Sequence, residues 1–232
     1  MAKHIPRLYC KTIQQYFKLS EFQSIHLVRV LRMKTGDIFI AFNSNDGEWL
    51  CSISEINKKS VIAKSSKLLQ KYIYSKTINL AFCLVKPDNN KLIIEKCTEL
   101  GVTDFYPIIS DYTQVRSINT EKLNTIAIQA SEQSERLDIP TIHEIMTFDQ
   151  FLQSINRNTI WMSAIERSNN TKSIFDLNLK NHNIGFVVGP EGGFSDTEKN
   201  ILYNKTIAIN ISKNILRSET ACITCIAISK AY

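Results

Sequence analysis

The sequence lacks several features that would assign the chain to whole classes of protein. No apolar run approaches the ~18 residues that a membrane-spanning helix needs. The first residues carry Lys3, Arg7 and Lys11 with no apolar core between them, which is unlike a secretory signal. Only four histidines are present, and they show neither zinc-cluster spacing nor a readable Ser–His–Asp arrangement. We therefore expect a cytoplasmic protein with no membrane partner and no metal site.

The six cysteines are scattered along the chain, and most lie within apolar runs, as reduced core cysteines of cytosolic proteins do. Cys222 and Cys225 form a C-x-x-C pair, a spacing that redox and metal sites also use. This pair lies inside a helical pattern without a second pair or a nearby histidine. The surroundings therefore favour core packing.

Positive charge is concentrated in the first third of the chain. Residues 1–75 contain 12 Lys and Arg against 5 Asp and Glu, whereas residues 76–232 contain 16 against 17. A localised basic excess is typical of a nucleic-acid-binding surface. A solvated basic surface without a partner is the alternative.

The first third also differs from the remainder in its pattern of elements. Ser20–Gln23 is a capping box before a helical apolar pattern that ends near Gly36. Short strands with tight turns follow, one of them at Asp46–Gly47, which favours a small barrel or sandwich. The expected strands are 38–42, 48–54 and 60–64. Residues 66–76 are interpreted as a linker, so we expect two domains divided near residue 70.

The second part alternates strands and helices, which predicts a parallel sheet built from right-handed βαβ units. Asp88 or Asn89 is expected to cap its first helix, and Thr147–Gln150 forms another capping box. Residues 168–183 are polar and poor in pattern, as variable surface segments are. The expected strands are 78–85, 102–109, 159–164, 184–188 and 206–211.

One stretch of this part has the features of a ligand loop. The apolar run Ile184–Val188 is followed by Gly189-Pro190-Glu191-Gly192-Gly193 and then by a capping box at Ser195–Glu198. The glycine loop thus lies between the carboxyl end of a strand and the start of a helix, where α/β proteins bind ligands. It matches neither the dinucleotide fingerprint nor the phosphate loop. An ordinary tight turn is the alternative.

A second strand–loop–helix unit follows immediately. Residues 206–211 are a strand candidate, residues 212–217 form a loop, and Ser218 is the expected N-cap of a final helix over 219–230. Two such units place two loops at one edge of a sheet. The final helix is apolar around much of its circumference, which favours a second partner surface and hence a homodimer.

These motifs resemble those of a known family. GPEGGFS at 189–195 and ILRSETA at 215–221 are similar to the two signature loops of the RsmE-like methyltransferases of the SPOUT superfamily. The resemblance extends over nearly the whole chain, with the motifs in family order. The other matching stretches are IPRLY at 5–9, HLVRVLRMKTGD at 26–37, VKPDNNKLIIEKCTELGV at 85–102 and ASEQSERLDIP at 130–140.

The resemblance implies a fold, a reaction and partners. Residues 1–70 would form a PUA-like RNA-binding β-barrel domain, and residues 71–232 a SPOUT-type parallel-sheet α/β domain with a C-terminal trefoil knot. The reaction implied is methylation of N3 of one uridine in 16S ribosomal RNA, with S-adenosylmethionine as cofactor. The partners implied are 16S rRNA or the small ribosomal subunit, and a second copy of the chain.

The resemblance also implies site residues. Arg217 and Glu191 are the catalytic candidates, with Arg217 holding either the donor carboxylate or the target's phosphate or uracil oxygen. Glu191 either acts near the methyl group or supports its own loop. Arg7, Arg29 and Arg32 are the RNA-binding candidates, the last two sharing a helix face. The cofactor-binding candidates are Ile165, Val188, Gly189, Pro190, Glu191, Gly192, Gly193, Ile209, Asn210, Ile211, Ile215, Leu216 and Arg217.

Other function classes stay open from the residues alone. One is an RNA-binding protein whose α/β domain is only a scaffold, although two intact signature loops argue against it. Another is a nucleotide-binding or nucleotide-hydrolysing enzyme, which would need a phosphate-loop lysine or a carboxylate pair. A third is a SPOUT methyltransferase that modifies tRNA or 23S rRNA instead.

Overall fold

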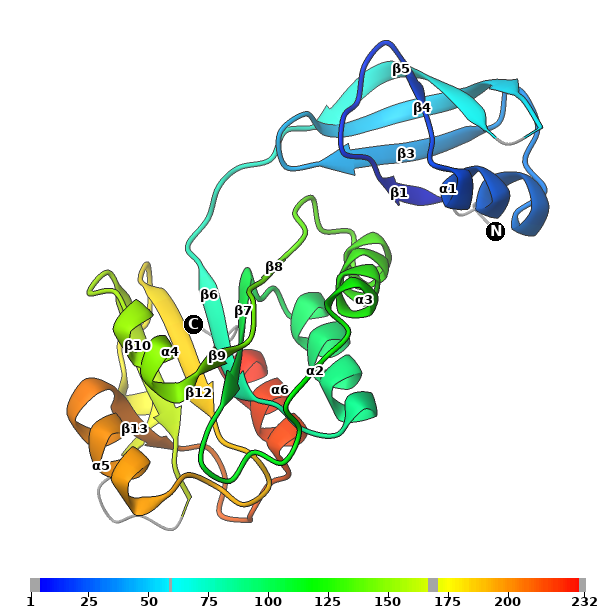
Figure 1. Ribbon diagram of the computed structural model, residues 1–232. Coiled ribbons are helices and arrows are strands. Elements are labelled where there is room, and N and C mark those ends of the chain that lie inside the picture. Colours follow the sequence, from blue (N-terminus) through cyan, green and yellow to red (C-terminus); the bar gives the residue numbers. More distant parts are fainter. Residues whose placement is uncertain (1–4, 59, 167–170, 230–232) are drawn as a thin grey trace. The chain divides into compact units, whose positions relative to one another are not determined.

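The computed structural model describes residues 5–58, 60–166 and 171–229 (Figure 1). The chain divides into two compact units: Met1–Tyr74 with Ser131–Ile139, and Ser75–Ala130 with Pro140–Tyr232. The sequence placed a boundary near residue 70 and assigned 131–139 to the second part. In the structure this segment completes the first unit, where Glu132 Oε1 accepts a hydrogen bond from Tyr9 N at 2.9 Å. The assignment of 1–70 and 71–232 as functional domains stays a prediction.

The first unit is built on a five-stranded mixed sheet in the order β1-β3-β4-β5-β2. The resemblance implied a small barrel in this part of the chain. The observed pairings join all five strands in one continuous path from β1 to β2. The hairpin predicted at Asp46–Gly47 is present, and Gly47 has φ +86°, which favours glycine. The strands are β1 (Arg7–Tyr9), β2 (Tyr16–Lys18), β3 (Ile38–Asn43), β4 (Gly47–Ile56) and β5 (Val61–Gln70).

Strand β5 is longer than the sequence suggested. Residues 66–70, interpreted as the start of a linker, continue the strand and pair with β4 as far as Gln70 opposite Glu48. The register shifts three times along this pairing. Such shifts bend a strand and interrupt the regular alternation of its side chains between the two faces. The loss of a clean alternation explains why the strand was not recognised.

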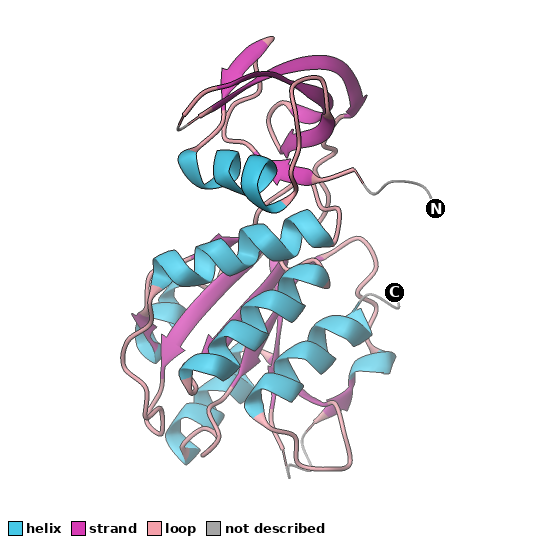
Figure 2. Cartoon of the chain, turned by 90° about the vertical axis from the view of Figure 1, so that its right-hand side faces the viewer, coloured by secondary structure: helices cyan, strands magenta, loops and turns pink. Residues whose placement is uncertain are grey.

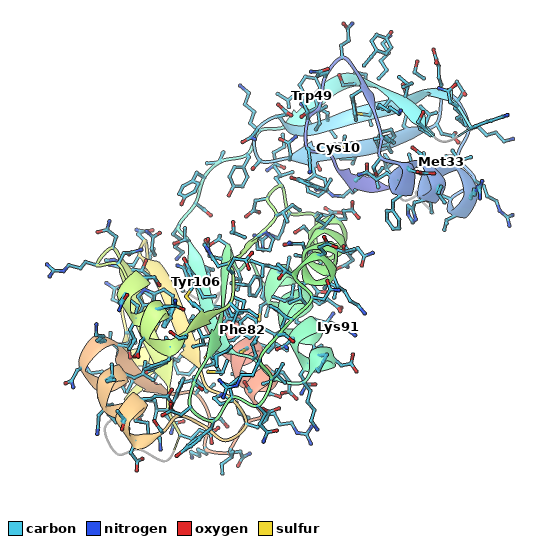
Figure 3. All side chains as sticks on the ribbon, in the orientation of Figure 1. Cys10, Met33, Trp49, Phe82, Lys91 and Tyr106 are labelled. Atoms are coloured by element: carbon cyan, nitrogen blue, oxygen red, sulfur yellow. The ribbon has the colours of Figure 1, made fainter. Side chains whose placement is uncertain are left out.

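A helix covers the core of the first unit. Helix α1 (Glu21–Ile25) begins at the predicted capping box, in which Ser20 Oγ accepts from Gln23 N at 3.2 Å. It continues into a π-helical turn, η1 (His26–Val30). Leu27 is fully buried there against Phe39 and Val61 in the core, and Cys10, Met33 and Trp49 belong to the same cluster (Figure 3).

The second unit contains an eight-stranded sheet whose strand pairings are all parallel, as expected. The order is β11-β13-β10-β12-β6-β7-β8, with β9 also pairing with β7. The strands are β6 (Ile78–Cys83), β7 (Asp104–Ile109), β8 (Thr141–Ile142), β9 (Met146–Thr147), β10 (Thr159–Ala164), β11 (Lys172–Ser173), β12 (Asn183–Val188) and β13 (Ile207–Asn210).

Helices flank this sheet. Figure 1 shows α4 and α5 on one side and α2 and α6 on the other, and Figure 2 looks onto the second of these sides. The helices are α2 (Pro87–Glu99), α3 (Thr120–Gln133), α4 (Phe148–Ser154), α5 (Asp196–Lys205) and α6 (Ser218–Ser229), with a 3₁₀ turn, η2 (Ile174–Asp176). Among the described residues, no helix has the length and apolar character needed to cross a bilayer.

The start of α2 corrects one expectation. Neither Asp88 nor Asn89 caps the helix, because the N-cap is Lys86 and Pro87 occupies the first helical turn. Asn90 is bonded to Val85, which lies two residues beyond β6. Val85 N donates to Asn90 Oδ1 at 3.1 Å, and Asn90 Nδ2 donates to Val85 O at 2.8 Å. These two bonds tie the first turn of the helix to the segment that connects it with the strand.

The two faces of the second sheet are packed by different residues. Ala81, Cys83 and Val187 face α4 and α5, whose Phe151 and Leu202 are fully buried. The alternate residues along β6 and β12 point to the opposite face. The C-x-x-C pair of α6 is fully buried, and burial raises the pKa of the Cys225 thiol to about 12. The expected core-packing role of this pair is confirmed.

Candidate active site

Three strands of the second unit end in one row. Ala164, the last residue of β10, is in register with Val188 at the end of β12 and with Ile209 near the end of β13. Because the three strands are parallel neighbours, the loops that follow them all leave the sheet at the same edge. This is the edge at which open α/β sheets bind ligands.

These loops enclose a cavity of about 560 Å³, within the range of roughly 300–1,000 Å³ typical of small-molecule sites. Every residue predicted to bind a cofactor lines it. They are Ile165, Val188, Gly189, Pro190, Glu191, Gly192, Gly193, Ile209, Asn210, Ile211, Ile215, Leu216 and Arg217. The sequence thus predicted which residues the fold brings together, while their roles remain to be tested.

Hydrogen bonds tie the three loops to one another. Ser218 Oγ donates to Gly189 O at 2.7 Å, and Leu216 N donates to Glu166 Oε1 at 3.2 Å. Ser218 was expected to cap α6, but it is the first helical residue and its hydroxyl joins the two signature loops instead. Sequence analysis missed Glu166 as a loop partner, although its position directly after β10 places it at the same edge.

The glycines allow close packing within the loops. A Cβ atom on Gly189 would lie 3.1 Å from the Phe194 ring, and one on Gly192 would lie 3.2 Å from Cβ of Tyr112. Gly193 is different: a Cβ there would meet nothing within 4 Å, but its φ of +72° disfavours other residues. A side chain at Gly193, which lines the cavity, would therefore strain the backbone and extend into open space.

The cavity wall is largely backbone and aliphatic side chain, with few charges. Glu166, Glu191, Lys199 and Arg217 are its charged lining residues. Glu191 and Arg217 are exposed, and the carboxylate of Glu191 has no hydrogen-bond partner within the ranges that the structure describes. Within those ranges no three His, Cys, Asp or Glu side chains are grouped to hold a metal ion. Such a wall suits a ligand recognised by shape and backbone groups.

A second cleft adjoins the first. It measures about 570 Å³ and shares Glu191 and Gly192 with the first cavity. Its other wall is the start of α2 and the loop after β7, including Lys86, Tyr112 and Gln114. The two spaces therefore meet at the glycine loop that follows β12.

The loop after β7 is fastened to the N-terminus of α5. Asp111 N donates to Glu198 Oε1 at 3.0 Å, and Ser195 Oγ donates to Asp111 Oδ2 at 2.5 Å. Glu198 Oε2 also accepts from Ser195 N at 2.9 Å, which completes the predicted capping box. The capping residues of α5 thus hold the loops on both sides of the second cleft.

Comparison with known proteins assigns this chain to a family. Residues 74–230 match the family model of the RNA methyltransferase domain, and residues 23–64 match that of the RNA methyltransferase PUA domain. The chain is 37% identical over 213 residues to ribosomal RNA small subunit methyltransferase E of Rickettsia conorii, covering 90% of this chain and 87% of that protein. The chain belongs to the ribosomal RNA small subunit methyltransferase E family.

Solved structures agree with this membership. A methyltransferase of Legionella pneumophila, in complex with S-adenosylmethionine, is 27% identical with a TM-score of 0.88 and covers 99% of this chain and 98% of its own. Methyltransferase E of Neisseria gonorrhoeae, bound to S-adenosylmethionine, is 25% identical with a TM-score of 0.88, covering 98% of each chain. The expected fold class, a SPOUT-type parallel-sheet domain preceded by a PUA-like domain, is confirmed. The trefoil knot stays a prediction.

One expected RNA-binding residue of this methyltransferase E family member lies in the interior. The side chain of Arg7 is 7% exposed and forms an ion pair with Glu48. Its Nη2 also donates to Arg136 O at 3.1 Å, and its guanidinium lies 4.7 Å from the centre of the Phe42 ring. Burial lowers the pKa of Arg7, against the opposing effect of Glu135 and Glu132. Arg7 is therefore held by contacts within the first unit, and its expected role as an RNA-binding residue stays a prediction.

The other two arginines are exposed but are arranged differently from the expectation. Arg29 lies on the π-helical turn, whereas Arg32 lies beyond the C-cap Leu31 and has φ +56°. The two residues therefore do not share a helix face at a spacing of three. Both remain accessible to a ligand, together with the exposed Val30 and Leu31 beside them.

Replacing Glu48 with Gln should destabilise the first unit by about 3 kcal/mol, because it leaves the buried Arg7 cation without its ion-pair partner. Glu55→Gln, at an exposed position on the same strand, is the matched control and should change stability little. Each unit contains a tryptophan, Trp49 and Trp161, so fluorescence would mix their signals. Hydrogen exchange, measured on peptides from β3 and β4 at increasing urea concentration, reports the stability of the first unit alone. Equal stability of the two variants would contradict the role assigned to Arg7.

Proposed function

We propose that this protein transfers a methyl group from S-adenosylmethionine to N3 of one uridine in 16S ribosomal RNA. The observation that carries the proposal is the convergence of both signature loops on one cavity at the carboxyl edge of β10, β12 and β13. Membership of the methyltransferase E family and the cofactor-bound structures of related proteins support the choice of reaction and donor. Because the substrate is ribosomal RNA, we place the protein in the cytoplasm.

The cavity fits the cofactor in size and in chemistry. Its volume of about 560 Å³ suits a ligand of nucleoside size, and the loops between strands supply backbone donors and acceptors for an adenine. Ile165, Val188 and Ile209 would provide the apolar wall, and Arg217 would bind the carboxylate of the methionine part. When bound, the cofactor supplies an electrophilic methyl group on a sulfonium.

The residues of the chain have to orient the two reactants and accept one proton. The N3–H bond of uracil is replaced by an N3–CH₃ bond, and the broken C–S bond leaves its electron pair on sulfur. One proton is released from N3. Glu191 is the carboxylate that borders both spaces, and the described residues offer it no partner, so we assign it the role of proton acceptor.

Replacing Glu191 with Gln should lower kcat for methyl transfer by about 10²- to 10⁴-fold, because a carboxamide cannot take up the proton. The affinity for S-adenosylmethionine, measured by calorimetry, should stay the same. The assay uses small subunits from a strain without the modification, and mass spectrometry of the digested RNA identifies 3-methyluridine. A fall in donor affinity instead would assign Glu191 to support of its loop. Transfer to tRNA or to 23S rRNA in place of 16S rRNA would favour the alternative targets.

The exposed arginines of the PUA-like domain are proposed to bind RNA phosphates. Replacing Arg29 and Arg32 with Ala should reduce the salt dependence of RNA binding by about two units of slope, because each arginine that no longer neutralises a phosphate removes about one. Binding of S-adenosylmethionine should not change. The control is Arg157→Ala with Lys180→Ala, which removes the same charge from exposed positions of the second unit. An unchanged salt slope combined with a loss of donor binding would show that these arginines serve the donor site of a partner subunit.

A homodimer is proposed from the surface of α6. Ile223, Ala227 and Ile228 of this helix keep part of their surface exposed, although the opposite side is fully buried. Light scattering should give twice the chain mass of 26.5 kDa, and Ile223→Glu should give the monomer mass. Asn204→Glu, at an exposed position of α5, serves as the control. A wild-type protein that is monomeric at micromolar concentration would refute the dimer.

A further inference from the structure

We propose that the second cleft, between Tyr112 and the glycine loop, is the acceptor site that receives the target pyrimidine nucleotide as an unpaired, everted residue of the RNA. The inference rests on the proposed methyl transfer and adds where the acceptor lies and which side chains recognise it. It assigns functions to Tyr112, Gln114 and Lys86, which lie outside both signature loops.

The position of the cleft is the first argument. The donor cavity and the second cleft have Glu191 and Gly192 in common, so a base in the second cleft borders the donor cavity at the glycine loop. Methyl transfer needs the acceptor atom in contact with the donor methyl, so the acceptor has to enter from a space that adjoins the donor cavity. A base inside a helical stack cannot enter a cleft of this size, and the target must therefore be unstacked.

Tyr112 supplies the second argument. Tyr112 is 54% exposed although its loop is firmly held, with Asp111 hydrogen-bonded to Ser195 and Glu198 at the start of α5. Ser110 N also donates to Thr113 Oγ1 at 2.9 Å, on the other side of the tyrosine. The Cβ of Tyr112 packs so closely on Gly192 that an added methyl there would lie 3.2 Å away. An exposed aromatic ring on a rigid loop is a platform for stacking a base.

The polar side chains of the cleft fit a uracil nucleotide. Gln114 and Lys86 are exposed, and within the described part of the chain neither side chain has a hydrogen-bond partner. The carboxamide of Gln114 offers a donor to a uracil carbonyl, and the ammonium group of Lys86 offers a positive charge to the phosphate. Glu191 borders the same space and is the acceptor for the N3 proton released when the N3–CH₃ bond forms and the C–S bond breaks.

The test separates the acceptor site from the proposed function as a whole. Tyr112→Ala should raise the KM for small-subunit RNA by about 5- to 150-fold, the range expected when one base–aromatic stack is removed. Tyr112→Phe should restore the KM to within about twofold, because the ring is retained. Calorimetry should give wild-type affinity for S-adenosylmethionine in both variants, which also verifies that they are folded.

Phe175→Ala is the matched control. Phe175 is an aromatic residue of the same unit that is 67% exposed and borders neither space, so the KM should not change. A wild-type KM in Tyr112→Ala, with active wild-type enzyme, would overturn the acceptor site and leave the methyl transfer standing. Loss of donor affinity in Tyr112→Ala would also overturn it, because the residue would then serve the donor cavity. A wild-type protein that methylates no RNA would refute the proposed function itself.

Discussion

The alignment of three parallel strand ends is the constraint on which the rest of the site depends. Ala164, Val188 and Ile209 lie in one row of the sheet. The loops that follow them therefore all leave the sheet at the same edge. A register shift of one residue in β10 would move its loop away from the other two and would exchange the two faces of the strand. Trp161 opposes such a shift, because it is buried in β10 and packs directly on Gly185 of β12, where an added Cβ would lie 2.5 Å from the indole.

Features that depend on nearby residues were predicted well from the sequence. The capping boxes at Ser20, Thr147 and Ser195 form as expected, because each needs only two side chains that are three residues apart. The cavity lining was also predicted, because apolar strands that alternate with helices fix a parallel sheet and therefore fix the edge at which the loops meet. The resemblance to a family supplied the identity of the ligand, which strand and loop patterns alone do not contain.

Features that depend on distant partners were not predicted. Arg7 looks like a basic surface residue until Glu48, Phe42 and Arg136 are placed around it. Ser218 looks like a helix cap, but its hydroxyl is used 29 positions back along the chain, at Gly189. Tyr112 stands out only when its loop is seen beside Gly192. In each case the sequence specifies the chemical type of the residue, and the tertiary environment decides its role.

The return of the chain to its first unit has a consequence for biosynthesis. Tyr9 and Arg7 find their partners Glu132 and Arg136 at separations of 123 and 129 residues. A ribosome that has released only the first 74 residues has therefore made an incomplete unit, whose Arg7 still lacks one of its hydrogen-bond acceptors. The amino-terminal part cannot finish folding before much of the second unit has been translated, although amino-terminal domains commonly fold first during synthesis. A fragment cut after Tyr74 would therefore keep the buried core of the first unit but would lack the segment 131–139 and with it the partners of Tyr9 and Arg7.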